Sequence, residues 1–228
     1  MTDELVADQL YRLDLGMVNA YLVDTGEATL IDAGTPNAVD DLRYELDEAG
    51  YDAEDIDRVL ITHFDLDHVG TLASLAFDCP IYAMEPDASY LDGARTPPLS
   101  NHKGILQRLT DFWLTRPSTP IQRLDDGDSV AGFDAYHAPG HTPGHAVYLH
   151  ETLHETLGVA FLGDLVAEED GSLTTPPWIL TYDTSENADS VRTLADSDLS
   201  FSIAAMGHGT PITEDGAEAL VELARQSD

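Results

Sequence analysis

The sequence is poor in two residue types, and each scarcity limits what the protein can be. One of the 228 residues is a cysteine, Cys79, and one is a lysine, Lys103. A single cysteine excludes an internal disulfide bond and a zinc site of clustered cysteines. A metal site in this chain must therefore be built from histidine and carboxylate side chains.

Positive charge is also scarce. Only 10 Lys and Arg residues stand against 43 Asp and Glu residues, which gives a formal net charge of −33. A hydrophobic content of 43% is ordinary, so the acidic residues are expected on the surface of a folded chain and not in its core. High net charge keeps halophilic proteins soluble, and salt near 1 M shortens the Debye length to about 3 Å. The composition predicts a halophilic protein, with an unusually acidic mesophilic protein as the alternative.

Long apolar runs and basic stripes are both missing. No stretch approaches the ~20 apolar residues that a membrane helix needs. The first eight residues are acidic and lack the basic flank and apolar run of a signal peptide. The chain would repel a phosphate backbone. We therefore expect a cytoplasmic protein with a small-molecule substrate, no membrane or nucleic-acid partner, and a monomeric or homodimeric state.

The hydrophobic pattern predicts one α/β domain over residues 1–228. Apolar, β-rich runs predict strands at 5–15, 18–23, 29–31, 59–61 and 81–84, and again at 121–124, 129–136, 146–150, 159–162 and 202–205. Amphipathic repeats predict helices at 37–49, 185–194 and 214–225. Because the second series repeats the first, we expect two related layers of one domain. The proline-rich segment at about 86–120 is expected to be a helical insertion that covers a surface, as a lid does.

Four potential metal ligands lie within six residues, just after the predicted strand 59–61. They are His63, Asp65, Asp67 and His68. On a strand the first three would form a bare polar row, and on a helix they would scatter. Neither arrangement suits a buried position without a metal ion. A loop that converges on a metal is therefore the main hypothesis, and a solvated acidic loop is the alternative.

Three further candidates follow predicted strands. His141 lies in a turn-rich segment, Asp164 ends a strand, and His208 follows the last strand. A second histidine, His145, lies in the same turn-rich segment as His141. Each of these residues alone would suit an ordinary capped turn. Their order and spacing together indicate a metal site.

With these motifs, the chain resembles the metallo-β-lactamase superfamily over nearly its whole length. The family pattern is a His-x-His-x-Asp-His loop followed by separate His, Asp and His ligands in that order. The resemblance implies a four-layer αβ/βα sandwich. Residues 30–34, Leu-Ile-Asp-Ala-Gly, are similar to the family's first motif. This similarity implies that Asp32 supports the metal loop from behind the ligands, with an ordinary turn residue as the alternative.

The resemblance also implies a site for two divalent ions. One ion would be held by His63, Asp65 and His141 and the other by Asp67, His68 and His208, with Asp164 bridging them. His145 is expected to support the site through a hydrogen bond. Imidazole and carboxylate ligands suit zinc, which is the expected metal.

Asp65 departs from the family pattern, which has a second histidine at this position. A carboxylate remains a metal ligand, but its negative charge shifts the preference towards harder ions such as Mn or Fe. If Asp65 does not bind metal, one of the two positions is weak and the protein holds a single ion.

The implied chemistry is hydrolysis. Two ions would activate a bridging hydroxide that attacks a carbonyl carbon, with Asp67 and Asp164 as candidate catalytic residues that move a proton. The reaction would cleave an ester, thioester or lactone of a small molecule, as in glyoxalase II-like or lactonase-like enzymes. The family's quorum-signal lactonases have a tyrosine where this chain has Ala167, and glyoxalase II has an added helical domain that is missing here. The substrate is therefore left open.

The sequence leaves two other functions open and suggests residues for a substrate pocket. The carboxylate at position 65 leaves open an iron-dependent oxidoreductase of the same fold, either sulfur dioxygenase-like or diiron. A metal-binding protein without catalysis is also left open. Trp113, Trp178 and Tyr182 are candidate walls of the substrate pocket, with packing in the core as the alternative.

Overall fold

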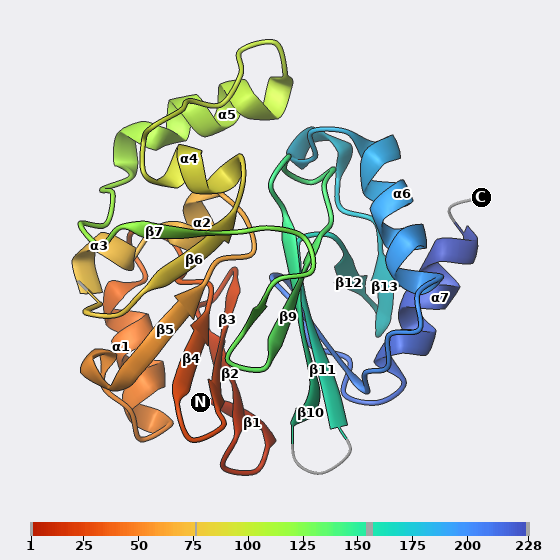
Figure 1. Ribbon diagram of the computed structural model, residues 1–228, viewed down its shortest axis with the longest axis horizontal. Coiled ribbons are helices and arrows are strands. Elements are labelled where there is room, and N and C mark those ends of the chain that lie inside the picture. Colours follow the sequence, from red (N-terminus) through yellow and green to blue (C-terminus); the bar gives the residue numbers. More distant parts are fainter. Residues whose placement is uncertain (1, 76, 154–156, 227–228) are drawn as a thin grey trace.

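Two β-sheets packed face to face form the centre of the protein, and helices cover their outer faces (Figure 1). The computed structural model describes residues 2–75, 77–153 and 157–226. Within these residues the first sheet has seven strands in sequence order, antiparallel from β1 to β4 and parallel from β4 to β7. They are β1 (Asp3–Val6), β2 (Leu10–Asp14), β3 (Asn19–Asp24), β4 (Ala28–Ile31), β5 (Ile56–Leu60), β6 (Ile81–Met84) and β7 (Ile121–Leu124).

The second sheet has the order β14, β11, β10, β9, β8 in the described part of the chain. Its strands are β8 (Ser129–Val130), β9 (Phe133–His137), β10 (Ala146–Leu153), β11 (Leu157–Gly163) and β14 (Ile203–Met206). Because β11 and β14 are parallel neighbours, their carboxyl ends lie at the same edge of the sheet. A small hairpin of β12 (Ala167–Glu169) and β13 (Ser172–Thr174) follows β11 in the sequence.

The helices form the two outer layers (Figure 1). The half with the first sheet carries α1 (Val39–Glu48), α2 (Leu66–Val69), α3 (Leu72–Leu75) and α4 (Asp87–Leu91), and the half with the second sheet carries α6 (Thr184–Ala195) and α7 (Gly216–Gln226). Short 3₁₀ helices are η1 (Ala53–Asp55), η2 (Asp111–Trp113) and η4 (Trp178–Leu180). None of the helices in the described ranges is long and apolar enough to cross a membrane.

Three apolar clusters separate the four layers. Leu42 of α1 is buried with Leu30 of β4 in the cluster outside the first sheet. Between the sheets, the rings of Tyr21 and Phe161 meet edge to face with centroids 5.4 Å apart. Val191 of α6 is buried in the third cluster, outside the second sheet. This layering confirms the four-layer αβ/βα sandwich.

Two predicted strands are hairpins, so their prediction as single strands was wrong. The run 5–15 turns between β1 and β2, and the run 129–136 turns between β8 and β9. The turns contain Asp8 at φ 58° and Ala131 at φ 51°, both in the left-handed region. Neither turn carries the Asn-Gly or Asp-Gly pair that marks a two-residue hairpin, which is why the pattern did not reveal them.

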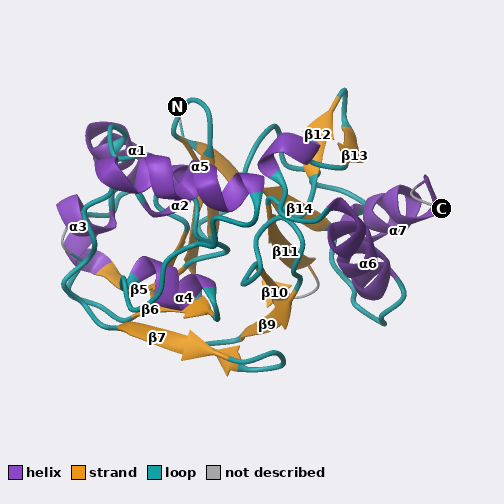
Figure 2. Cartoon of the chain, turned by 90° about the horizontal axis from the view of Figure 1, so that it is seen from above, coloured by secondary structure: helices purple, strands orange, loops and turns teal. Residues whose placement is uncertain are grey.

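The segment 86–120 contains α4, η2 and a longer helix, α5 (His102–Thr110). Seen from above, α5 extends across the molecule towards the half that holds β14 (Figure 2). The Asn101 side chain caps α5 by accepting a hydrogen bond from the Lys103 N–H at 2.9 Å. Lys103 and Gln107 lie one turn apart and are buried, whereas Leu109 is 66% exposed. The helix therefore has one face against the protein and one face towards solvent.

Candidate metal centre

The seven candidate ligands come from four segments that each follow a strand. His63 and Asp65 come after β5, and α2 then carries Asp67 and His68. The other three are His141 between β9 and β10, Asp164 after β11 and His208 after β14. These segments meet at one place. Three overlapping groups of potential ligands lie there, and within each group the ligand atoms lie within 4.8 Å of one another.

The first group consists of His63, Asp65 and His141. The Asp65 Oδ2 lies 3.3 Å from the His63 Nε2 and 3.2 Å from the His141 Nε2. The Asp164 Oδ2 lies 3.6 Å from the same His141 nitrogen. Ligand atoms around a tetrahedral ion with bonds of about 2.1 Å are separated by about 3.4 Å. The spacing of the first group therefore matches a metal position.

The second group consists of Asp67, His68 and His208, with Asp164 beside it. The His208 Nε2 lies 3.5 Å from the Asp67 Oδ2 and 3.2 Å from the Asp164 Oδ2. The other oxygen of Asp164, Oδ1, lies 3.5 Å from the His68 Nε2. Asp164 thus faces both groups, as a bridging carboxylate would.

Several buried polar atoms at this place have no hydrogen-bond partner among the described residues. Those that face the ligand groups are the His63 Nε2, the His68 Nε2 and the Asp164 Oδ1, and the His141 Nδ1 and the His145 Nδ1 also lack a partner. Leaving such an atom unpaired in the interior costs roughly 1–3 kcal/mol, and the three that face the ligand groups can donate an electron pair to a cation. These residues therefore fit a divalent metal ion, and the fit is clearest where His68 meets Asp164.

Hydrogen bonds behind the ligands fix which nitrogen faces the centre. The His68 Nδ1 bonds to the Asp32 Oδ2 at 2.8 Å, and the His208 Nδ1 bonds to the Met17 carbonyl at 2.6 Å. The His63 Nδ1 pairs with the Thr62 Oγ1 at 2.9 Å. In each case the Nε2 is left for the centre, the arrangement that metal-ligating histidines commonly have.

Asp32 lies behind the ligand loop. It accepts hydrogen bonds from the Thr62 N–H at 2.9 Å and the Thr62 hydroxyl at 2.7 Å, in addition to its bond with His68. Its φ of 60° is in the left-handed region, which Asp tolerates better than most residues. The sequence ATLIDAG turns sharply at this residue, and the turn directs the carboxylate to the loop after β5.

His145 also lies behind a ligand. The Asp164 N–H donates to its Nε2 at 3.2 Å, and the ring is fully buried. Burial, with the positive charge nearby, brings the pKa of His145 well below its usual range, so the ring is neutral at pH 7. A neutral ring can accept this bond, and it thereby holds the backbone of Asp164.

Asp87 of α4 joins the two ligand loops and was not predicted from the sequence. Its carboxylate accepts hydrogen bonds from the Phe64 N–H at 2.8 Å, the Thr142 hydroxyl at 2.6 Å and the Gly144 N–H at 2.9 Å. Burial raises the pKa of Asp87, although the hydrogen bonds from Thr142 and Phe64 oppose the rise. The sequence carries no local signal for this role, because its partners are distant along the chain.

Charge at the centre favours ionised carboxylates. Burial alone would raise the pKa of Asp65, but the Lys103 ammonium and His141 bring it well below its usual range. Burial would also raise the pKa of Asp164, and His68 is the main group that instead brings it well below its usual range. Both carboxylates are therefore charged at neutral pH and can bind a cation.

Lys103 is the most consequential residue that was not predicted. Its Nζ lies 2.7 Å from the Asp65 Oδ2 and 2.6 Å from the His141 Nε2, and the side chain is 2% exposed. Gln107, one turn along α5, donates to the Asp65 Oδ1 at 2.8 Å. One signal was available, since this is the only lysine in a chain with 43 acidic residues. Its position could not be predicted, because it depends on how the insertion packs.

A cavity of about 500 Å³ opens above the ligands. Its inner end is formed by Asp65, Asp67, Lys103, His141, Asp164 and His208. Its walls are mainly apolar and include Met17, Leu66, Leu106, Val166, Pro176, Pro177 and Leu180. The cavity therefore has room for a sizeable apolar group beside the candidate ligands.

The three predicted pocket aromatics are not among the residues that line this cavity. Trp113 is 62% exposed and Trp178 is 66% exposed, so neither packs in the core. The Tyr182 hydroxyl donates to the Gln107 Oε1 at 2.5 Å and so braces α5. Among the described residues, aliphatic side chains and prolines supply the apolar part of the lining in place of these rings.

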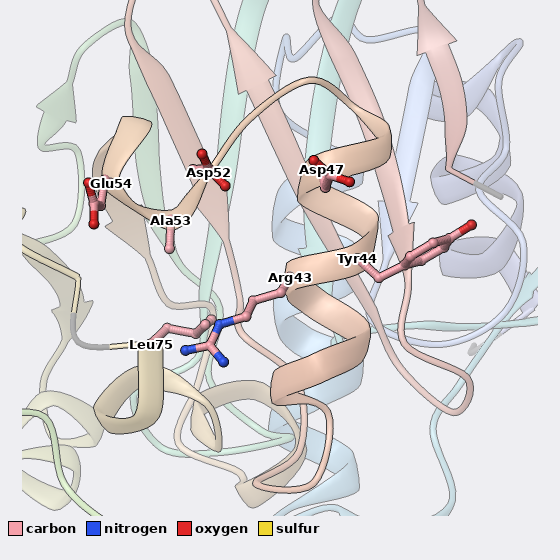
Figure 3. A pocket seen from close by; sticks show the side chains of 7 residues that line it. All are labelled: Arg43, Tyr44, Asp47, Asp52, Ala53, Glu54 and Leu75. Atoms are coloured by element: carbon pink, nitrogen blue, oxygen red, sulfur yellow. The ribbon is translucent and has the colours of Figure 1, made fainter.

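A second cavity lies beside α1 and η1 (Figure 3). It is lined by Arg43, Tyr44, Asp47, Asp52, Ala53, Glu54 and Leu75. Arg43 reaches from α1 towards Leu75. None of the close groups of metal-ligating side chains found in the described ranges includes a residue of this cavity. The candidate functional site is therefore the cavity above the metal centre.

A model of the metallo-β-lactamase superfamily matches residues 13–208 of the chain. The chain therefore belongs to the metallo-β-lactamase superfamily. The match includes the region of every candidate ligand from His63 to His208. Membership and the geometry together indicate a metal-binding protein of hydrolase type.

Solved structures support this assignment. The crystal structure of the metallo-β-lactamase family protein TTHA1429 from Thermus thermophilus has a TM-score of 0.71 and 26% identity, covering 95% of this chain and 78% of that one. BJP-1, a subclass B3 metallo-β-lactamase of Bradyrhizobium japonicum, has a TM-score of 0.71 and 19% identity, covering 99% and 91%. At 19% identity the likeness to BJP-1 shows the fold alone.

One curated relative is similar at the level of sequence. The uncharacterized protein YobT of Bacillus subtilis (strain 168) is 31% identical over 132 residues. The matched region is 54% of this chain and 53% of that protein, so the chain spans about half the length of this relative.

Proposed function

We propose that the protein is a metal-dependent hydrolase that cleaves a carbonyl ester, thioester or lactone of a small molecule with an apolar acyl group. The observation that carries the proposal is the group of unpartnered donor atoms, the His63 Nε2, the His68 Nε2 and the Asp164 Oδ1. Of these three residues, Asp164 lines the inner end of an apolar cavity. Zinc is the proposed metal, because imidazoles and carboxylates supply the ligands.

The residues have distinct roles in this proposal. A bound divalent ion supplies a Lewis acid and lowers the pKa of water. In this proposal His68, His208 and Asp164 would hold the ion. The Asp67 side chain is 37% exposed and lies at the cavity, so it can accept a proton from the attacking water as well as bind metal. No serine or cysteine nucleophile is required.

The acyl group is proposed from the cavity walls. Their side chains are aliphatic, and Lys103 is the one Lys or Arg among the lining residues. Lys103 is already paired with Asp65, so a substrate carboxylate has no free partner in the lining. An uncharged acyl chain of several carbons fits these walls better than a charged one.

The test is hydrolysis of p-nitrophenyl esters by natively purified protein, by protein treated with a chelator, and by the same protein after zinc is restored. We expect the chelator to abolish hydrolysis, zinc to restore it, and longer acyl chains to be cleaved more efficiently than acetate. His208→Ala should abolish activity. His102→Ala, in which the lost histidine is exposed and outside the metal groups, is the matched control.

Two results would overturn the proposal. Turnover that survives removal of all metal would exclude a metal-dependent reaction. Native iron, with oxygen consumption and no ester or thioester cleavage, would indicate an oxidoreductase of the same fold instead.

A further inference from the structure

The single lysine of the chain lies where the first of two metal ions would be bound. The Lys103 Nζ is within hydrogen-bond distance of the Asp65 Oδ2, at 2.7 Å, and of the His141 Nε2, at 2.6 Å. These are two of the three atoms of the first metal-ligating group. A divalent ion and the ammonium therefore require the same two atoms.

The Lys103 ammonium and a metal ion would compete most directly for the Nε2 of His141. A lysine ammonium donates hydrogen bonds and accepts none, so the His141 Nε2 must accept, and its proton must be on Nδ1. The Nε2 of a neutral imidazole has one lone pair. The lone pair that accepts from Lys103 is the one that a metal ion would need, so His141 can serve one cation at a time.

Asp65 is also satisfied without a metal ion. Its Oδ2 is paired with Lys103, and its Oδ1 accepts from the Gln107 Nε2 at 2.8 Å. The metal position of the second group, Asp67, His68 and His208, differs from that of the first group. There the His68 Nε2 and the Asp164 Oδ1 have no hydrogen-bond partner among the described residues. His63 does not require the first position either, since it also forms a close group with His68 and Asp164.

The fold holds Lys103 in this place. Gly104 packs so closely that an added Cβ would lie 2.2 Å from the Pro98 carbonyl oxygen and 2.9 Å from the Tyr182 hydroxyl. Asn101 caps the helix at the Lys103 N–H, and Tyr182 bonds to Gln107. The start of α5 is therefore fixed against Tyr182, whose N–H donates to the His141 carbonyl at 3.1 Å, and the lysine side chain is buried.

From these contacts we infer that the Lys103 ammonium takes the place of the first metal ion, and that the protein holds one divalent ion, between Asp67, His68, His208 and Asp164. The inference rests on the proposed metal centre and deepens it. The positive charge at the first position is then supplied by the protein itself. The charge of Asp65, which distinguishes this chain from the family pattern, is the partner of that ammonium.

The test is metal stoichiometry by mass spectrometry of the elements, after saturation with zinc and removal of free zinc. Wild type should bind one zinc ion per chain, and Lys103→Met, which keeps the stem but removes the ammonium, should bind two. Thr110→Val is the control, because Thr110 lines the same cavity on α5 and bonds only to carbonyls of its own helix among the described residues. It should bind one.

Each other outcome has a definite meaning. Two ions in wild type would overturn the role of Lys103 and leave the hydrolase proposal standing. One ion in both wild type and Lys103→Met would show that the lysine excludes nothing, which also overturns the inference. A folded wild type that binds no zinc would remove the metal centre, and the proposed function with it.

A second measurement needs no variant. Because Lys103 is the only lysine, an amine-reactive reagent followed by peptide mass spectrometry reports on this one side chain, apart from the amino terminus. In zinc-saturated wild type we expect Lys103 to be modified at least about tenfold more slowly than in the unfolded chain, because it remains buried between Asp65 and His141. Modification at the rate of the unfolded chain would show that zinc expels it and would overturn the inference.

Discussion

At the scale of single residues, Asp32 connects the backbone to the metal chemistry. It has a left-handed φ of 60°, and its carboxylate bonds to the Thr62 N–H, the Thr62 hydroxyl and the His68 Nδ1. The same residue therefore shapes the turn after β4, fastens the ligand loop and orients one ligand. Its importance lies in the hydrogen bonds and not in direct contact with a metal ion.

Asp32→Asn tests this role. Asn also tolerates a left-handed φ, but its amide offers one oxygen acceptor where the carboxylate has two, so His68 or Thr62 loses its partner. We expect zinc affinity to fall by about tenfold to a hundredfold, measured by competition with a chromophoric chelator. Asp8→Asn is the matched control, because Asp8 also has a positive φ, 58°, but lies in the β1–β2 turn. Equal affinities for the two variants would contradict the role assigned to Asp32.

At the scale of elements, α5 supplies both a wall of the cavity and the cation at its inner end. Leu106 lines the cavity, whereas Leu109 is 66% exposed and is absent from the lining in the described structure. Both residues are on the same helix, so the same substitution at the two positions separates contact with substrate from the stability of α5.

Leu106→Ala should lower kcat/KM for a long-chain ester by about tenfold, because a lost apolar contact of this size is worth roughly 1–3 kcal/mol. The value for the acetate ester should change little, since a short acyl group does not reach this wall. Leu109→Ala should leave the ratio of long to short esters unchanged. A uniform loss for both esters in Leu106→Ala would mean that α5 acts through stability or metal binding and does not contact the acyl chain.

Features that depend on local sequence could be predicted, and features that depend on the packing of distant elements could not. The clustering of the candidate ligands at 63–68 was predictable because their spacing within one loop is a local property, and the buried face of α1 followed from its leucine spacing. Lys103 was not predictable as part of the site, because it is 38 residues from His141 and reaches it through the packing of α5. Asp87 was missed for the same reason. The exposed Trp113 shows that the presence of an aromatic residue does not by itself predict whether its side chain is buried.

At the scale of the whole molecule, the net charge of −33 sets the conditions for folding. Exposed carboxylates repel one another, and this repulsion acts over about 10 Å at 0.1 M salt but only about 3 Å at 1 M. The described cations are mostly used in local pairs, such as Arg12 with Asp3 and Arg123 with Asp92. They are too few to offset the rest of the surface.

We therefore predict that the melting temperature rises with KCl concentration from 0.1 M to 2 M, because screening weakens repulsion in the folded state more than in the expanded chain. For a chain of 228 residues, a shift of about 2–4 °C would correspond to about 1 kcal/mol. Differential scanning calorimetry provides the measurement, and an equimolar sucrose series is the control for solute effects unrelated to charge. A melting temperature that does not change with KCl would contradict this prediction.

The most direct test of the central claim, a metal centre at the inner end of the apolar cavity, is anomalous X-ray diffraction from crystals of the natively metallated protein, with data collected on both sides of the zinc absorption edge. We predict one anomalous peak bounded by Asp67, His68, His208 and Asp164, and density for the Lys103 side chain between Asp65 and His141. Crystals of active protein without an anomalous peak among these residues, at the edge of zinc or of any other transition metal present, would contradict the claim.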